Sequence, residues 1–181
     1  KIKEIIDYEG KSVVNKGAPL IPGETHRHWG FKEGMPLHYA AAYSDNPDVI
    51  HLLIDNGANI NSRDKGNNTP LHLAAHGNNL DIVNALISRE PNLDTRNSNG
   101  NTPLHFASEK IGNQGTLVLK LLIDVGANPN IKNNEGDTPL HIVIKNYTNP
   151  ETLIKLKLLI DAGALTQVKN DGGLTPYDIA Y

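Results

Sequence analysis

Residues 69–72, Thr69-Pro70-Leu71-His72, decide the fold, because this tetrapeptide returns at nearly regular intervals along the chain. The other copies are Met35-Pro36-Leu37-His38, Thr102-Pro103-Leu104-His105, Thr138-Pro139-Leu140-His141 and the altered Thr175-Pro176-Tyr177-Asp178. Consecutive copies start 33 to 37 residues apart. A period of this length is typical of stacked structural repeats, which form one elongated body with a continuous core. The pattern favours a binding scaffold over an enzyme.

The unit from 69 to 101 shows the physical plan of one repeat. Thr69 suits the position before a helix, where its hydroxyl can accept a free backbone N–H, and Pro70 suits the first helical position, where its missing N–H costs nothing. A second helix follows, with apolar residues at helical spacing: Leu80, Ile82, Val83, Leu86 and Ile87. Two helices this short cannot bury their apolar faces alone, so each pair must pack against its neighbours.

Composition limits the classes of partner and location. The 181 residues carry a net charge of −3, and no apolar run approaches the roughly 18 residues of a membrane span, so we expect neither nucleic-acid nor membrane binding. Cysteine is absent, which fits a reducing compartment such as the cytoplasm, or a host cytosol if the chain is a secreted effector. Because the sequence starts at Lys1 rather than at methionine, we expect a fragment of a larger protein, and we expect a monomer.

The order and phase of these motifs over residues 35 to 178 resemble the ankyrin-repeat family. The resemblance implies an all-α solenoid of stacked antiparallel helix pairs with projecting β-hairpin loops. It also implies a concave face, lined by the first helices and the hairpin tips, that commonly binds another protein. We therefore divide the chain into a degenerate N-terminal capping unit with a long loop (1–34), repeats over 35–68, 69–101, 102–137 and 138–174, and a partial unit over 175–181.

Three departures from the repeat carry further predictions. Extra residues near 112–115 and 147–150 predict longer loops or differently placed helix starts between the two helices of a unit. Glu90-Pro91 stands where other units have Gly-Ala, which predicts a different helix end there. Asn67 stands where other units have glycine, and asparagine is the least costly substitute in left-handed backbone.

The histidines of the repeated tetrapeptide are expected to be structural. His38, His72, His105 and His141 recur once per unit, so we interpret each imidazole as a polar tie to the neighbouring turn. A metal site would need several of these side chains to converge, which the repeat prevents. Apart from the pair His26 and His28, the sequence contains no other catalytic, cofactor-binding or metal-binding pattern, and we expect no cofactor or metal.

The resemblance places the candidate protein-binding residues on hairpin tips and first helices. They are Trp29, Phe31, Lys32, Tyr43, Lys65, Asn68, His76, Ser98, Asn99, Asn101, Glu109, Lys110, Asn134, Glu135 and Asp137. The aromatic residues near the N-terminal end are the expected anchors, because Trp and Tyr are favoured at interface centres. Three alternatives stay open: Trp29 and Phe31 could instead cover the end of the solenoid, His26 and His28 could bind a metal, or the surface could be solvated with no single partner.

The sequence supports one leading function and two alternatives. The leading hypothesis is a non-catalytic scaffold that binds another protein through its concave face and hairpin tips. The alternative is a targeting or regulatory fragment of a larger enzyme, or a host-directed effector of a bacterium or virus. An enzyme in its own right is the third and least supported reading.

Overall fold

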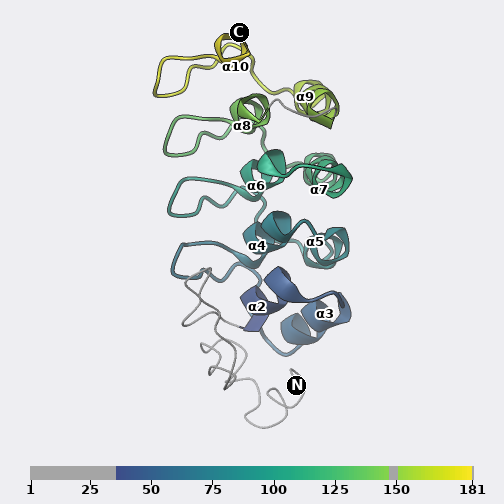
Figure 1. Ribbon diagram of the computed structural model, residues 1–181. Helices are drawn as coiled ribbons and strands as arrows, with labels where there is room; N and C mark the ends of the chain where they lie inside the picture. The colour runs from purple at the N-terminus through teal and green to yellow at the C-terminus, as the bar shows by residue number, and fades with distance from the viewer. Residues whose placement is uncertain (1–35, 147–150, 181) are drawn as a thin grey trace, which may run out of the picture.

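The computed structural model describes residues 36–146 and 151–180, which form helix pairs stacked in one column (Figure 1). Each pair is one repeat. The pairs are α2 (Pro36–Tyr43) with α3 (Asp48–Asp55), α4 (Pro70–Gly77) with α5 (Leu80–Ile87), α6 (Pro103–Glu109) with α7 (Asn113–Asp124), and α8 (Pro139–Lys145) with α9 (Glu151–Asp161). Helix α10 (Pro176–Ile179) opens a fifth unit. The capping unit proposed for 1–34, with Trp29, Phe31 and Lys32, lies outside the described residues.

The first helices begin as their sequence predicts. Thr69 lies in extended backbone (φ −88°, ψ 165°) directly before Pro70, and Thr102, Thr138 and Thr175 repeat this geometry. Proline at the first helical position needs no acceptor for a backbone N–H. The repeated tetrapeptide is therefore a helix-start signal that sets the phase of each unit.

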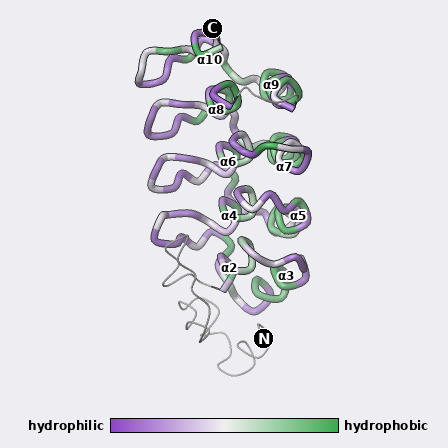
Figure 2. The backbone as a smooth tube through the Cα atoms, in the orientation of Figure 1, coloured by the Kyte–Doolittle hydropathy of each residue, from purple (hydrophilic) through white to green (hydrophobic). Residues whose placement is uncertain are grey.

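The core runs through the whole stack. Leu71, Leu104 and Leu140, one from each first helix, are at most 1% exposed, and Leu86 and Leu122 from the second helices are fully buried. Apolar residues follow the helices while the projecting loops are hydrophilic (Figure 2). Each unit contributes its share of a core that no unit could close by itself.

The projecting loops correct one expectation. Over 36–146 and 151–180 they contain no β-strand, so the expected β-hairpins are tight turns. In one such turn the Asp64 N–H donates to the Asn68 carbonyl at 2.9 Å, and the equivalent bond joins Asn97 to Asn101 at 2.9 Å. Successive turns are also joined, because the Ser98 N–H donates to the Gly66 carbonyl of the preceding turn at 2.9 Å. Stacking thus extends from the helices to the loop tips.

The end of α5 differs from its neighbours less than expected. Glu90 takes a left-handed φ of 53°, as Gly57 (94°) and Gly126 (95°) do after α3 and α7. The prediction of a different backbone turn was wrong. One difference remains: the Ala58 and Ala127 N–H groups each bond back to the helix, whereas Pro91 in the equivalent position has no N–H to donate.

Replacing Glu90 with glycine is expected to stabilise the protein. A residue with a Cβ in left-handed backbone costs about 1 kcal/mol, and glycine removes that cost at this site. Glycine also makes the unfolded chain more flexible, which offsets part of this gain. We therefore expect Glu90→Gly to raise the free energy of unfolding, measured by urea titration, by about 0.5–1 kcal/mol. Gly126→Ala is the reciprocal control and should lower it by a similar amount, and a loss of stability in Glu90→Gly would contradict this reading.

The extra residues of the third unit lengthen a helix. Helix α7 has 12 residues where α5 has 8, and it begins at Asn113 after Gly112, whose φ is 92°. The prediction of a differently placed helix start is confirmed here. Gly115 lies so close to Lys110 that a Cβ would come within 2.8 Å of the Lys110 carbonyl oxygen, which explains the glycine in this helix. The second insertion, at 147–150, lies outside the described residues.

Candidate protein-interaction face

The four repeated histidines tie each unit to the next. The Nε2 atoms of His38, His72, His105 and His141 lie 3.0–3.2 Å from the backbone carbonyl oxygens of Asn68, Asn101, Asp137 and Leu174 in the following loop. All four imidazoles are at most 2% exposed. The expected role of these residues is confirmed, and they hold the projecting loops in position.

The bonds of these histidines define their protonation state. The Thr69 N–H donates to Nδ1 of His72 at 3.0 Å, so Nδ1 is an acceptor and Nε2 carries the proton. The Thr69 hydroxyl also lies 2.8 Å from the same Nδ1. Burial lowers the pKa of His72 to about 4, and that of His105 to about 4 as well. A protonated ring could not accept from the threonine, so the ties require neutral imidazole.

A ladder of polar side chains joins the loops, and it includes three of the predicted contact residues. Asn97 Nδ2 donates to Asn68 Oδ1 at 2.8 Å, and Asn133 Nδ2 donates to Asn101 Oδ1 at 3.0 Å. At the next step Asn170 Nδ2 donates to a carboxylate oxygen of Asp137 at 2.8 Å. The side chains of Asn68, Asn101 and Asp137 therefore connect adjacent units.

The predicted exposure of Asp137 at a loop tip was wrong, because its side chain is fully buried. Its carboxylate also pairs with the ammonium group of Lys145 on α8. Burial raises its pKa, but the hydrogen bonds from Lys145 and Asn170 outweigh burial and the net pKa is lowered. A carboxylate that is bonded in this way and fully buried supports the loop and is not accessible to a partner.

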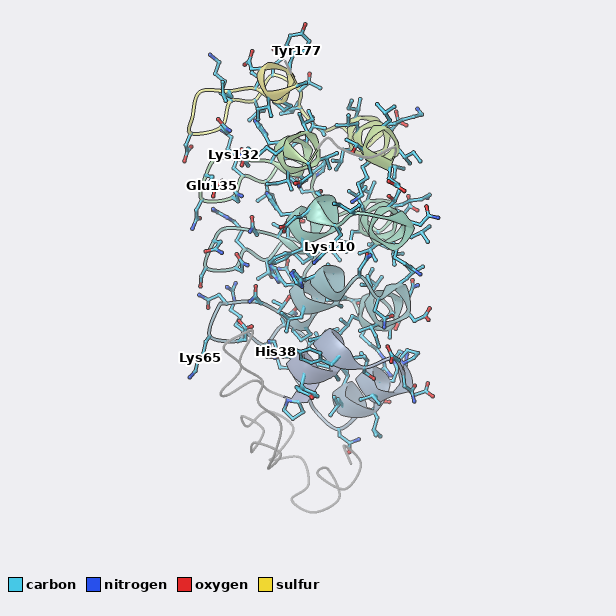
Figure 3. All side chains as sticks on the ribbon, in the orientation of Figure 1. His38, Lys65, Lys110, Lys132, Glu135 and Tyr177 are labelled. Carbon is cyan, nitrogen blue, oxygen red and sulfur yellow. The ribbon has the colours of Figure 1, made fainter. Side chains whose placement is uncertain are left out.

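The remaining tip residues are exposed. Lys65, Ser98, Asn99, Asn134 and Glu135 all lie on the surface of the loops, where Figure 3 labels Lys65 and Glu135. Two of them also bond within the stack, since Asn134 Nδ2 donates to the Ser98 carbonyl at 2.8 Å. These loops present an ordered polar surface with several exposed side chains.

Side chains on the first helices form the other half of the face. The Tyr43 ring is 47% exposed at the end of α2 and lies 5.0 Å from the Tyr39 ring, and Glu109 is exposed at the end of α6. His76 was expected to be exposed on the first helix, but it is half-buried. Its ring stands edge-on to Phe106 at 5.4 Å.

Lys110 completes the middle of the face. Its Nζ lies 3.2 Å from Nε2 of His76 in the preceding unit. Burial, and then the positive charge of Lys110, lower the pKa of His76, so the imidazole is a neutral acceptor for the ammonium group. Lys110 and His76 thus form one polar contact that bridges two units of the face.

Lys155 on α9 is a feature that sequence reasoning missed. It is 4% exposed, and its ammonium group donates to the carbonyl oxygen of Ala107 at 2.9 Å and also to that of Lys110, both at the end of α6. Burial lowers its pKa to about 8. Alignment of the second helices gives a signal, since Lys155 stands where Ile82 and Val118 are buried apolar residues. The lysine secures the end of α6 in the unit that carries the insertion.

The described residues offer no candidate metal site and no candidate membrane span. Over 36–146 and 151–180, no three His, Asp or Glu side chains converge as metal ligands would. In the same part of the chain, every helix is too short or too polar to cross a membrane.

The stack of short helix pairs with projecting turns defines a helical-repeat solenoid. A family model described as ankyrin repeats (3 copies) matches residues 37–118 and 111–181. Since these matches cover most of the sequence, the chain belongs to the ankyrin-repeat family. No curated protein matches the chain. Ankyrin repeats are generally protein-interaction modules, and proteins built from them are typically non-catalytic scaffolds.

Proposed function

We propose that this chain is a non-catalytic scaffold that binds another protein through the concave side of the stack. The proposed contact surface, called the interaction face below, comprises first-helix and loop-tip residues, of which His76 and Lys110 are half-buried and the rest are exposed: Tyr43, Lys65, His76, Ser98, Asn99, Glu109, Lys110, Asn134 and Glu135. Trp29, Phe31 and Lys32 stay in the proposal on sequence grounds alone. We further propose that the chain acts as a monomer in the cytoplasm.

The differences between equivalent positions of the repeats support this proposal. The leucine of each tetrapeptide is kept and buried, from Leu37 to Leu140. Five residues later each of these helices carries a different side chain: the half-buried Ala42 and His76 and the exposed Glu109 and Lys145. Packing explains why the buried position repeats. Chemical variety at exposed positions on a fixed frame is what selective recognition requires, because function resides in sites carried by a fold.

Tyr43 is the proposed anchor among the described residues. An exposed tyrosine offers a large apolar ring with a polar tip, and such residues contribute a disproportionate share of binding energy when a partner buries them. The following two units carry the His76–Lys110 contact and Glu109, which supply both signs of charge to the proposed face. A partner surface with one apolar pocket and flanking polar groups would match this arrangement.

Quantitative protein capture from the native source tests the interaction face. The variant Tyr43→Ala/Glu109→Lys changes the face, and Leu117→Ala/Asp124→Lys makes matched changes on α7, where Leu117 is 45% exposed. Loss of an anchor costs about 2 kcal/mol or more, so the face variant should bind its specific partner about thirtyfold more weakly. The α7 variant should capture it normally. Equal capture by both variants, or equal loss in both, would contradict this site.

A further inference from the structure

Each projecting loop carries a basic residue at the same position, directly before the Asp or Asn that opens the turn. These residues, named the basic column here, are Arg63, Arg96, Lys132 and Lys169. All four are exposed, and they recur once per unit on the loops that stack in register beside the first helices (Figures 1 and 3). The repeat therefore places four cations in a row along the stack.

Hydrogen bonds to the next unit fix the direction of these side chains. Arg63 Nη1 donates to the Arg96 carbonyl at 3.1 Å, and Lys132 Nζ donates to the Lys169 carbonyl at 2.7 Å. Arg96 Nη2 donates to Asn134 Oδ1 at 3.0 Å. The cationic groups of Arg63, Arg96 and Lys132 therefore point along the stack axis, each towards the following loop.

The acceptors of these bonds are neutral, so the positive charges are not cancelled. Elsewhere cations pair with carboxylates: Arg89 with Asp55 at 2.8 Å, Lys157 with Asp161 at 2.9 Å, and Lys120 with Asp124. Within 36–146 and 151–180, no carboxylate oxygen lies within 4.0 Å of a cationic nitrogen of the basic column.

The acidic groups of the same loops are largely occupied. Asp64 accepts hydrogen bonds from the Gly66 and Asn68 N–H groups at 2.8 and 2.7 Å, and Asp137 is buried against Lys145. Glu135 lies 3.8 Å from the same lysine, and Asp171 is exposed at the last loop. The basic column is thus the part of the described surface where unpaired positive charge recurs in register.

We propose that the basic column binds an extended acidic segment of a partner protein, with one carboxylate per unit. This inference rests on the proposed protein-binding function and adds the chemistry of the partner. Packed helices lie 8–10 Å apart, so successive cations are about 10 Å apart, and an extended chain rises about 3.3 Å per residue. The partner segment should therefore carry an acidic residue at about every third position.

The same geometry disfavours a nucleic acid as the occupant. Single-stranded nucleic acids bind where aromatic side chains stack on successive bases beside the basic groups. In the described loops no exposed aromatic residue lies beside the column, since Tyr43 and Tyr177 belong to helices. The net charge of −3 also differs from that of a nucleic-acid-binding domain.

Fluorescence anisotropy with a synthetic peptide tests the proposal on the full chain. The probe has twelve residues with Glu at every third position and Ser or Thr between, and an isomer carries the same four glutamates consecutively. An exposed ion pair contributes about 0.2–1 kcal/mol, so R63Q/R96Q should weaken binding of the spaced peptide about fivefold. The quadruple variant R63Q/R96Q/K132Q/K169Q should weaken it at least about twentyfold. Added salt should weaken binding to the native chain.

The matched control is K120Q/K157Q, which removes the same charge as R63Q/R96Q from the second helices and should change affinity less than twofold. If this control loses as much affinity as R63Q/R96Q, the effect comes from net charge alone and the proposal is overturned. Equal affinity for the two isomers, failure of the native chain to bind the spaced peptide, or tighter binding of a single-stranded oligonucleotide of equal charge would also overturn it. If the captured partner depends on Tyr43 but not on the column, this inference fails and the proposed function stands. If capture depends on neither, both fail.

Discussion

Lowering the pH from 7 to 4.5 is expected to remove about 5 kcal/mol of stability through two buried histidines. Burial lowers the pKa of His72 and of His105 to about 4, against an ordinary value of 6.5. Between these values the unfolded chain binds a proton at each histidine that the folded chain does not bind. Stability is therefore full above about pH 6.5 and is lost as the pH falls towards 4, by about 2.5 kcal/mol per histidine at pH 4.5.

Urea unfolding followed by circular dichroism at pH 7, 5.5 and 4.5 measures this loss. The variant H72Q/H105Q separates the cause, because it removes both rings. It should be less stable than the native chain at pH 7 by about 2 kcal/mol or more, since buried partners of the rings are left unpaired. The stability of the variant should change much less with pH than that of the native chain. If the variant keeps the full pH dependence, the histidine ties are not the source of that dependence.

Carboxylates do not explain a loss in this range. Asp178 has its pKa lowered from 3.8 by the hydrogen bond from the Thr175 N–H and then by that from its hydroxyl, and the net pKa of Asp137 is also lowered. Their stabilising contribution is present above about pH 4 and is lost only below it. The histidines and the carboxylates therefore change the stability of the protein in separate pH ranges.

Leu122→Ala is expected to cost about 3 kcal/mol. The side chain is fully buried on α7 within the core that joins the units, and truncating a buried leucine removes apolar contacts and leaves a cavity. The measurement is the free energy of unfolding in urea. Leu117→Ala on the same helix is the matched control, because that leucine is 45% exposed and should cost about 0.5 kcal/mol or less. Equal losses in the two variants would contradict the assigned core.

Much of the fold could be predicted because its determinants are local and repeated. The Thr-Pro step starts each first helix, and the spacing of residues such as Ile82, Val83 and Leu86 marks the buried side of the second helix. The turn conformation of Glu90 could not be predicted. The repeat requires left-handed backbone at position 90. Stacking on both sides imposes this conformation on Glu90, although a residue with a Cβ disfavours it.

The site was predicted less well than the fold, because exposure depends on side-chain partners in other units. Asn68 and Asn101 belong to tip positions by sequence, but their amides meet Asn97 and Asn133 of the following loops. Lys155 pairs with carbonyl groups more than forty positions earlier in the chain, a partnership that helical spacing does not reveal. Tyr43, which lies at the end of its helix, was predicted to lie on the surface and is 47% exposed.

Hydrogen exchange of the full chain, with and without the partner recovered by capture, tests most directly where binding occurs. The account predicts slower exchange in the first helices and loops, over residues 36–43, 63–77, 96–110 and 132–145, with α7 and α9 unchanged. Protection confined to the second helices, over 113–124 and 151–161, would show that the partner binds the opposite side and would contradict the interaction face.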